Sequence, residues 1–301
     1  MKILLVTPLS SSSGDPHRFW FKALKELKQQ VKIFPLNDFP QLKLIKSWQL
    51  GREIGKFQPE EIFFSGGIDA VFPLKNTVFF TGVAAKTLSS SERQTGIQAK
   101  LVVVNDPSHI LTWKNLGAKK AVCLPISAID PDYFKPVKIT KTIPVSFVGT
   151  LFPYRQQQLL DIIKLCPQLK IWGRLESGVE VFRELKPYYQ GEAWGKQVVR
   201  IYRKSLIGLN LAPSHLFSAG NIRTFEIPAC QALLLSNKLN PDWYLPGKEA
   251  VVFHNSKDCA KKINYYLHHE QERRALALSG YRRTLKDHTY KKRFQQLLKL
   301  L

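Results

Sequence analysis

Short, continuous apolar runs recur along this chain, and they limit its fold more than any other feature of the sequence. In the first part of the chain they lie at 2–9, 31–35, 61–67, 77–83, 101–106 and 121–127. Helical or loop segments separate them, such as the helix-period segment 19–30. Continuous apolar strands in this arrangement are typical of a parallel sheet that is covered on both faces.

The pattern stops and restarts around residues 131–144, a segment with three prolines, three lysines and no helical period. Strands are predicted again at 145–150, 169–173, 205–212, 232–237 and 249–255, with helices at 156–166, at 222–230 and from 257 onward. A chain of 301 residues is long enough for two domains. We therefore predict two doubly wound α/β domains, 1–136 and 137–301, with ligands at the carboxyl ends of the strands and in the cleft between the domains.

The net charge is unusually high. The chain has 45 Lys and Arg against 23 Asp and Glu, a formal charge of +22. Residues 137–301 hold 27 basic and 12 acidic residues, so most of the excess lies in the second domain. Such a charge argues against an acidic, calcium-buffering surface and favours an anionic partner: a phosphate-bearing ligand, an anionic membrane face, or a polyanion such as DNA.

The sequence contains no closely spaced cysteine pair of the C-x-x-C type, and we expect no targeting signal. The four cysteines, Cys123, Cys166, Cys230 and Cys259, are too far apart for a structural zinc site, and we expect reduced thiols. The amino terminus is better explained as a strand than as a signal peptide, and no stretch of about 18 apolar residues occurs. We expect a cytoplasmic protein without an obligate protein partner, with peripheral binding at the inner membrane face as an alternative.

The segment 220–237, GNIRTFEIPACQALLLSN, carries the most chemistry. Gly220 and Asn221 suit a loop before a helix whose amino end favours a phosphate, and Arg223 would meet that anion from the first turn. Glu226 lies about one turn further and would accept hydrogen bonds from a vicinal diol such as ribose. The alternative is a surface ion pair between Arg223 and Glu226.

This segment resembles the signature of the spore-maturation (CgeB-like) glycosyltransferases, a branch of the GT-B superfamily, in which Asn-x-Arg-x-Phe-Glu-x-x-Ala-Cys stands at this place. Further pieces match in the order of that family, and together they cover about 130–301. They are DPDYFKP at 130–136, SFVGTLFPYR at 146–155, IWGR at 171–174, YYQG at 188–191, IYRKSLIGLNL at 201–211, YLPGKEAVVF at 244–253, INYYLHHEQERRALALSGY at 263–281 and DHTYKKR at 287–293.

The resemblance implies a GT-B fold and a glycosyltransferase whose second domain binds a nucleotide-diphosphate sugar while the first binds the acceptor. Glu226 would hold the ribose, and Arg223 and Thr224, with the helix start at Asn221, would lie near the diphosphate or sugar. Arg155, in the loop that begins at Gly149, would bind a phosphate. Trp172 and Gly173 would lie near the base, and His215 near the phosphates or sugar.

One position departs from the pattern of the wider retaining GT-B group. A second glutamate often stands eight residues before the ribose-binding one, and Ser218 occupies that position here. A usual contact with the donor sugar is therefore absent, so the identity of the donor sugar is left open. We expect retention of configuration at the anomeric carbon. No Asp-x-Asp motif occurs in the chain, so we predict a metal-independent enzyme without a cofactor, in which cations and helix ends stabilise the leaving diphosphate.

The amino-terminal domain offers weaker candidates. Gly14 follows the first predicted strand, where such domains often approach the donor, and 65–69 is a glycine-containing loop after another strand. Asp106 and His109 follow a third strand and are candidates for the base that activates the acceptor. The alternative for Gly14 is a turn glycine, and for Asp106 and His109 it is a turn or N-cap role.

Three functions remain open from the sequence. The first is a glycosyltransferase that acts on a surface glycan, a lipid-linked acceptor or a protein. The second keeps this chemistry but transfers the sugar to a nucleic-acid base. The third is a GT-B-shaped binding protein without catalytic activity.

Overall fold

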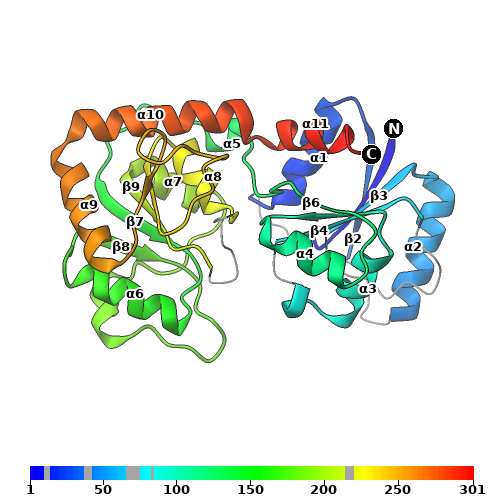
Figure 1. Cartoon of the computed structure of the whole chain (residues 1–301), viewed down its shortest axis with the longest axis horizontal. Coiled ribbons are helices and arrows are strands. Elements are labelled where there is room, and N and C mark those ends of the chain that lie inside the picture. Colours follow the sequence, from blue (N-terminus) through cyan, green and yellow to red (C-terminus); the bar gives the residue numbers. More distant parts are fainter. Residues whose placement is uncertain (10–13, 37–42, 66–74, 83–84, 214–219) are drawn as a thin grey trace. The chain divides into compact units, whose positions relative to one another are not determined.

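The structure is a computed structural model that describes residues 1–9, 14–36, 43–65, 75–82, 85–213 and 220–301. The chain divides into two compact units, shown in Figure 1. The first contains Met1–Ala128 and Tyr290–Leu301, and the second contains Ile129–Pro213 and Asn221–Thr289.

The first unit is built on a parallel sheet in the order β2-β1-β3-β4-β5-β6. Because β2 lies on one side of β1 and β3 on the other, the winding reverses between β1 and β3. The strands are β1 (Lys2–Thr7), β2 (Gln30–Pro35), β3 (Glu61–Phe64), β4 (Thr77–Thr81), β5 (Leu101–Val104) and β6 (Ala121–Cys123). Its helices are α1 (Pro16–Glu26), α2 (Lys43–Phe57), α3 (Ser90–Gln98), α4 (Ser108–Asn115) and α11 (Tyr290–Leu298), with a 3-10 turn at Ala85–Thr87.

Helices cover both faces of this sheet. Successive strand residues point to opposite faces, so Phe63 and Phe64 belong to different layers. The ring of Phe63 stacks on Phe294 of α11, whereas Phe64 lies in a cluster with Leu50 of α2 and Trp113 of α4. A strand that is buried on both sides must be apolar throughout, which explains the continuous runs in the sequence.

The second unit repeats the design in the order β11-β10-β9-β7-β8, again with parallel pairs. Its winding reverses between β7 and β9. The strands are β7 (Ile143–Val148), β8 (Leu169–Trp172), β9 (Ser205–Asn210), β10 (Leu233–Ser236) and β11 (Val251–Val252). The helices are α5 (Pro131–Phe134), α6 (Pro153–Ile163), α7 (Lys196–Lys204), α8 (Arg223–Ala229), α9 (Ser256–His268) and α10 (Glu270–Asp287), with a 3-10 segment at Arg183–Tyr188.

The core of the second unit is also two-sided. Phe147 packs with Leu159 of α6 and Ile263 of α9 on one face. On the other face α8 lies directly against β9, because Gly208 has no side chain: a Cβ there would come within 2.5 Å of Ile227 Cγ2. This close packing fixes α8, which carries the signature segment, onto the sheet.

Every strand of both sheets overlaps a run that the sequence predicted, although β2 begins one residue and β7 two residues before the predicted start, and the α/β class is confirmed. The division of the chain differs from the predicted one in two respects: the second unit begins at Ile129 and not at residue 137, and the last helix belongs to the first unit. In Figure 1, α11 (red) lies beside α1 (blue), although the two are far apart in the sequence. Phe19 of α1 stacks on Tyr290, and Phe294 contacts Trp20, so α11 completes the core of the first unit. Among the described residues, no helix combines the length and the apolar character that a membrane crossing requires.

We expect the substitution Phe294→Ala to destabilise the first unit by about 3–5 kcal/mol, because a buried ring between Trp20 and Phe63 would be replaced by a cavity. Urea unfolding followed by tryptophan fluorescence measures this change. Lys299→Ala, at an exposed position just after the same helix, is the matched control and should leave the unfolding midpoint unchanged. Equal midpoints for the two variants would contradict this account of α11.

Candidate functional site

The carboxyl ends of β7 and β9 form the point in the second sheet where the winding reverses. In doubly wound sheets the loops diverge there and leave room for a ligand. The loop after β7 leads into α6, and the segment after β9 leads to α8. Most of the predicted donor-binding residues, including Gly149, Arg155, Arg223 and Glu226, lie on these two connections.

Two of the predicted glycines hold β7 and β8 close together just beyond their ends. The N–H of Gly149 donates to Trp172 O at 3.0 Å, and the N–H of Gly173 donates to Gly191 O at 3.1 Å. Gly173 has a φ of +154°, and a Cβ on it would lie 1.8 Å from Gly149 O. Only glycine fits at 173, and this close approach fixes the position of half-buried Trp172.

Arg155 joins the two diverging connections. Only 5% exposed, it donates from Nη1 to Thr150 O (2.7 Å) and from Nη2 to Leu211 O (2.9 Å). Its guanidinium also lies against three rings, at 5.3–5.8 Å from their centroids, those of Phe147, Phe152 and Tyr154. Burial lowers the pKa of Arg155. In this structure the side chain therefore holds main chain in place, and phosphate binding by Arg155 stays a prediction.

Arg223 and Glu226 form an ion pair on the first turn of α8, through Arg223 Nη1 and Glu226 Oε2. This is the alternative that the sequence left open. Arg223 also donates from Nε to Val148 O at 3.1 Å, which ties α8 to the end of β7. Burial alone would lower the pKa of Arg223, but Glu226 and Tyr202 together outweigh it and the pKa is raised. The Glu226 side chain is 7% exposed and that of Arg223 is 21% exposed, so the arginine is the more accessible of the two. The ribose contact of Glu226 stays a prediction.

A network of uncharged polar side chains connects the ends of β9 and β10 to α8. Asn221 Nδ2 donates to Asn210 Oδ1 at 2.8 Å. Asn210 Nδ2 in turn lies 3.1 Å from both Thr224 Oγ1 and Ser236 Oγ. The sequence analysis selected Asn221 and Thr224 but missed Asn210 and Ser236. The sequence does carry a signal for Asn210 and Ser236, because each is the polar residue at the end of an apolar strand.

His215 and Ser218 lie outside the described residues, so nothing is added here to the predictions made for them. In the described part of the chain, no three His, Cys, Asp or Glu side chains form a group suited to a metal ion.

The first unit carries a hydrogen-bonded set of three side chains that the sequence analysis missed. Asp15, His17 and Ser65 meet at the carboxyl ends of β1 and β3, where the winding of this sheet reverses. His17 Nδ1 lies 2.9 Å from Asp15 Oδ1, and His17 Nε2 lies 2.9 Å from Ser65 Oγ. Asp15 is also the N-cap of α1 and accepts the backbone N–H of His17 at 2.8 Å. One carboxylate therefore begins the helix and orients the imidazole.

These contacts define the protonation of His17. A carboxylate only accepts hydrogen bonds, so Nδ1 carries the proton and Nε2 is left to accept one from Ser65. Burial lowers the pKa of His17, and the attraction of Asp15 offsets only part of this effect. The imidazole is therefore neutral at pH 7 and has an accepting nitrogen, as a general base requires.

The predicted residues of the first unit have separate positions. Gly14 immediately precedes Asp15 and is half-buried. Asp106 is fully buried and accepts hydrogen bonds from Ser108 N (3.0 Å) and Ser108 Oγ (2.7 Å), the turn role given above as the alternative. His109 is buried within α4. A base role for Asp106 or His109 stays a prediction, and His17 has the more suitable geometry.

The substitution Gly173→Ala should disrupt the loop after β7, because the new Cβ would overlap Gly149 O. We expect a clear drop in the melting temperature. Gly191→Ala is the matched control, because Gly191 also has a positive φ (+92°) but a Cβ there would meet nothing within 4 Å. It should lose only the roughly 1–2 kcal/mol of left-handed backbone strain. An equal loss in both variants would show that close approach is not what selects glycine at 173.

Part of the chain is similar in sequence to a known protein family. Residues 155–299 match the family described as glycosyl transferase-like. No curated protein has a significantly similar sequence.

Solved structures match the whole chain in fold. Anabaena HepE in complex with UDP-glucose is 12% identical, with a TM-score of 0.70 over 100% of this chain and 99% of that one. Sucrose-phosphate synthase from Thermosynechococcus elongatus is 13% identical, with a TM-score of 0.69 over 100% and 98%. A glycosyltransferase from Rickettsia africae is 13% identical, with a TM-score of 0.69 over 99% and 97%. The predicted GT-B fold is confirmed, and residues 155–299 are similar to a glycosyl transferase-like family.

Proposed function

We propose that this protein is a glycosyltransferase of the CgeB-like type that transfers a sugar from a nucleotide diphosphate to an acceptor hydroxyl. The observation that carries the proposal is the glycosyl transferase-like match over 155–299. The matched segment includes Arg155, Gly173 and α8, but not Gly149. The acceptor would be a surface glycan, a lipid-linked sugar or a protein.

A uridine diphosphate sugar is the first donor to test, because HepE, similar in fold, has been solved with UDP-glucose. The leaving diphosphate gains negative charge as the glycosidic bond breaks. Arg223 would stabilise that charge without a metal, since its guanidinium is held in position by Val148 O and Glu226 before the ligand arrives. Ribose would bind on the Glu226 side of the same turn.

His17 is our candidate for the base that activates the acceptor. In the step we propose, the acceptor oxygen forms the new bond to the anomeric carbon of the donor while the bond to the diphosphate breaks. The acceptor proton passes to His17 Nε2, and Asp15 stabilises the imidazolium that results. Ser65 would yield its place at Nε2 to the acceptor hydroxyl.

This dyad bears on stereochemistry. A single displacement by an acceptor deprotonated at His17 inverts the anomeric centre. The proposal therefore favours inversion over the retention expected from the resemblance. The anomeric configuration of the product, measured by NMR, distinguishes the two outcomes.

We expect Glu226→Gln to weaken binding of UDP and UDP-glucose by about tenfold or more, because an uncharged amide is a poorer partner for both Arg223 and a ribose diol. Thermal shift is a suitable measurement, since ligand at 100 times its dissociation constant stabilises by about 2.7 kcal/mol. Glu184→Gln, an exposed change in the same unit, is the control. If no nucleotide or nucleotide sugar stabilises the wild-type protein, the proposed function fails.

His17→Asn should lower kcat by about 10²–10⁴-fold and leave the affinity for the donor unchanged. Because the basic form is the active one and burial lowers its pKa, kcat/KM of the wild type should rise with pH through a value below 6.5 and then level off. Asp15→Asn should also reduce kcat, whereas Ser65→Ala should retain most of it.

His268→Asn, at an exposed position at the end of α9, is the control for the loss of an imidazole. If His17→Asn keeps the wild-type rate and pH profile, the acceptor base lies elsewhere, while the donor-binding result above still tests the transferase itself.

A further inference from the structure

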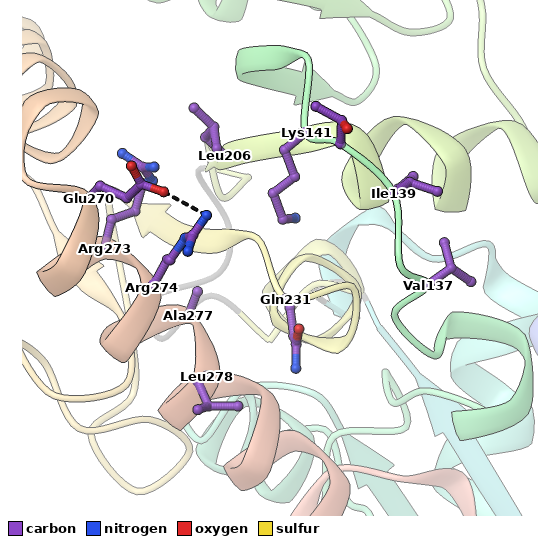
Figure 2. Close-up of a pocket in the computed structure, with 11 residues that line it drawn as sticks. Val137, Ile139, Lys141, Leu206, Gln231, Glu270, Arg273, Arg274, Ala277 and Leu278 are labelled. Carbon is purple, nitrogen blue, oxygen red and sulfur yellow. Dashed lines mark ion pairs between the residues drawn. The ribbon is translucent and has the colours of Figure 1, made fainter.

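A cavity of about 670 Å³ opens at the amino-terminal edge of the second sheet. Lys141 lies just before β7, Leu206 is the second residue of β9, and Gln231 precedes β10. The amino-terminal turns of α10, which include Arg274, form another wall (Figure 2). The predicted donor residues lie at the opposite, carboxyl ends of the same strands. Six-residue strands separate the two edges by roughly 15–20 Å.

Lys141 brings a desolvated positive charge to this cavity. Its ammonium donates to Ser205 O at 2.8 Å and to Arg203 O at 3.2 Å. Burial, with a smaller contribution from nearby Arg273, lowers the pKa of Lys141 to about 8, although Cys230 offsets part of this effect. The described residues place no carboxylate in an ion pair with Lys141. A desolvated cation without an opposite charge is costly, and an anion in the cavity would remove that cost.

Two arginines of α10 add to the positive potential. Arg273 is buried and donates from Nη1 to Tyr266 O (2.6 Å) and Leu267 O (3.2 Å), at the end of α9. Arg274 is 78% exposed and pairs with Glu270 at 2.6 Å, and in Figure 2 its guanidinium and the Lys141 ammonium point into the same hollow. Three cations against one carboxylate leave the cavity with a net positive charge.

A neighbouring hollow extends this charge. It shares Val137 and Ile139 with the cavity, and Lys196, Arg200, Arg203 and Lys204 line it with the single carboxylate of Asp132. Val137 and Ile139 are exposed apolar residues between two basic hollows. The positive charge thus surrounds an apolar strip.

Apart from Thr140 and Gln231, apolar side chains form the rest of the cavity lining, and they decide the kind of anion. Ile139, Leu206, Ala277 and Leu278 supply these walls. A volume of about 670 Å³ lies in the range of sites that enclose a small organic molecule. An inorganic ion would leave the apolar walls uncovered.

We propose that this cavity is a second ligand site, distinct from the donor site, for an organic phosphate: its phosphate meets Lys141 and Arg274, and its apolar portion lies against Ile139 and Leu278. The site does not depend on the proposed transferase activity. The phosphate belongs either to a soluble metabolite or to a lipid headgroup, and the experiment below distinguishes the two sources.

The test is calorimetric titration of the intact chain with hexyl phosphate, with inorganic phosphate and hexanol as half-ligands. Hexyl phosphate should bind saturably, at least tenfold more tightly than either half alone, and UDP should not displace it. A lipid source predicts that vesicles with phosphatidic acid bind the chain and compete with hexyl phosphate. A soluble source predicts binding of hexyl phosphate without vesicle binding.

Variants locate the site. Lys141→Met and Arg274→Gln should each weaken hexyl phosphate binding by about tenfold, as expected for loss of one charged hydrogen bond. Arg282→Gln, at an exposed position on the same helix that does not line the cavity, should leave it unchanged. Because Arg274 is exposed, its variant remains informative even if Lys141→Met disturbs folding.

Three results would overturn the proposal. They are the absence of saturable binding by the wild type, equal affinity in Arg274→Gln and Arg282→Gln, and displacement of hexyl phosphate by UDP. The first would show that the cavity takes no such ligand. The second would place the bound phosphate away from α10, and the third would place it in the donor site.

Discussion

The geometry of the second unit depends on a buried guanidinium. Where the winding of a parallel sheet reverses, the connections after the two central strands leave in different directions, and their carbonyl groups lose the neighbours that a strand would have provided. Arg155 donates to Thr150 O on one side and to Leu211 O on the other, within a surround of three aromatic rings. Its Nε is buried and has no hydrogen-bond partner among the described residues. Burying a charged side chain costs free energy. Here the buried guanidinium of Arg155 holds the two main-chain connections in fixed positions.

The same principle operates on a smaller scale in the first unit. There the reversal lies between β1 and β3, and His17 bridges it through its contact with Ser65. Asp15 orients His17 by two contacts from one oxygen, to the backbone N–H and to the imidazole. The N-cap that starts α1 is thus also what orients the candidate base. A change that weakened the cap would also free the imidazole, so helix stability and proton transfer are physically coupled at this residue.

Whether a feature could be predicted from the sequence depends on how far apart in the chain the interacting residues lie. Strands such as Leu101–Val104 and Leu233–Ser236 were predictable because burial on both faces requires apolar residues at consecutive positions. The assignment of α11 to the first unit was not, since an amphipathic pattern shows that a helix has an apolar face but not which sheet receives it. His17 and Ser65 were missed for a related reason: 48 residues separate them, and only the fold brings them together. Arg223 and Glu226 were found because their contact is local, at three residues' separation.

Positively charged residues lie at both edges of the second sheet, and the two sets differ in the partners that they have within the protein. At the carboxyl edge, each of the two arginines already has protein partners: Arg155 has carbonyl groups, and Arg223 has a carbonyl and a carboxylate. The positive charge of Arg223 is therefore partly neutralised by Glu226 before any ligand binds, which suits the proposed donor site, where a diphosphate would leave after each reaction. At the amino edge, Lys141 has carbonyl groups but no paired carboxylate among the described residues, and Lys196, Arg200 and Lys204 lie in the adjoining hollow with one acidic residue. An excess of uncompensated cations beside apolar side chains favours retention of an anion rather than its release. The part of the +22 charge that a nucleotide diphosphate would not require is therefore explained more directly by the amino edge of the second sheet than by the proposed donor site.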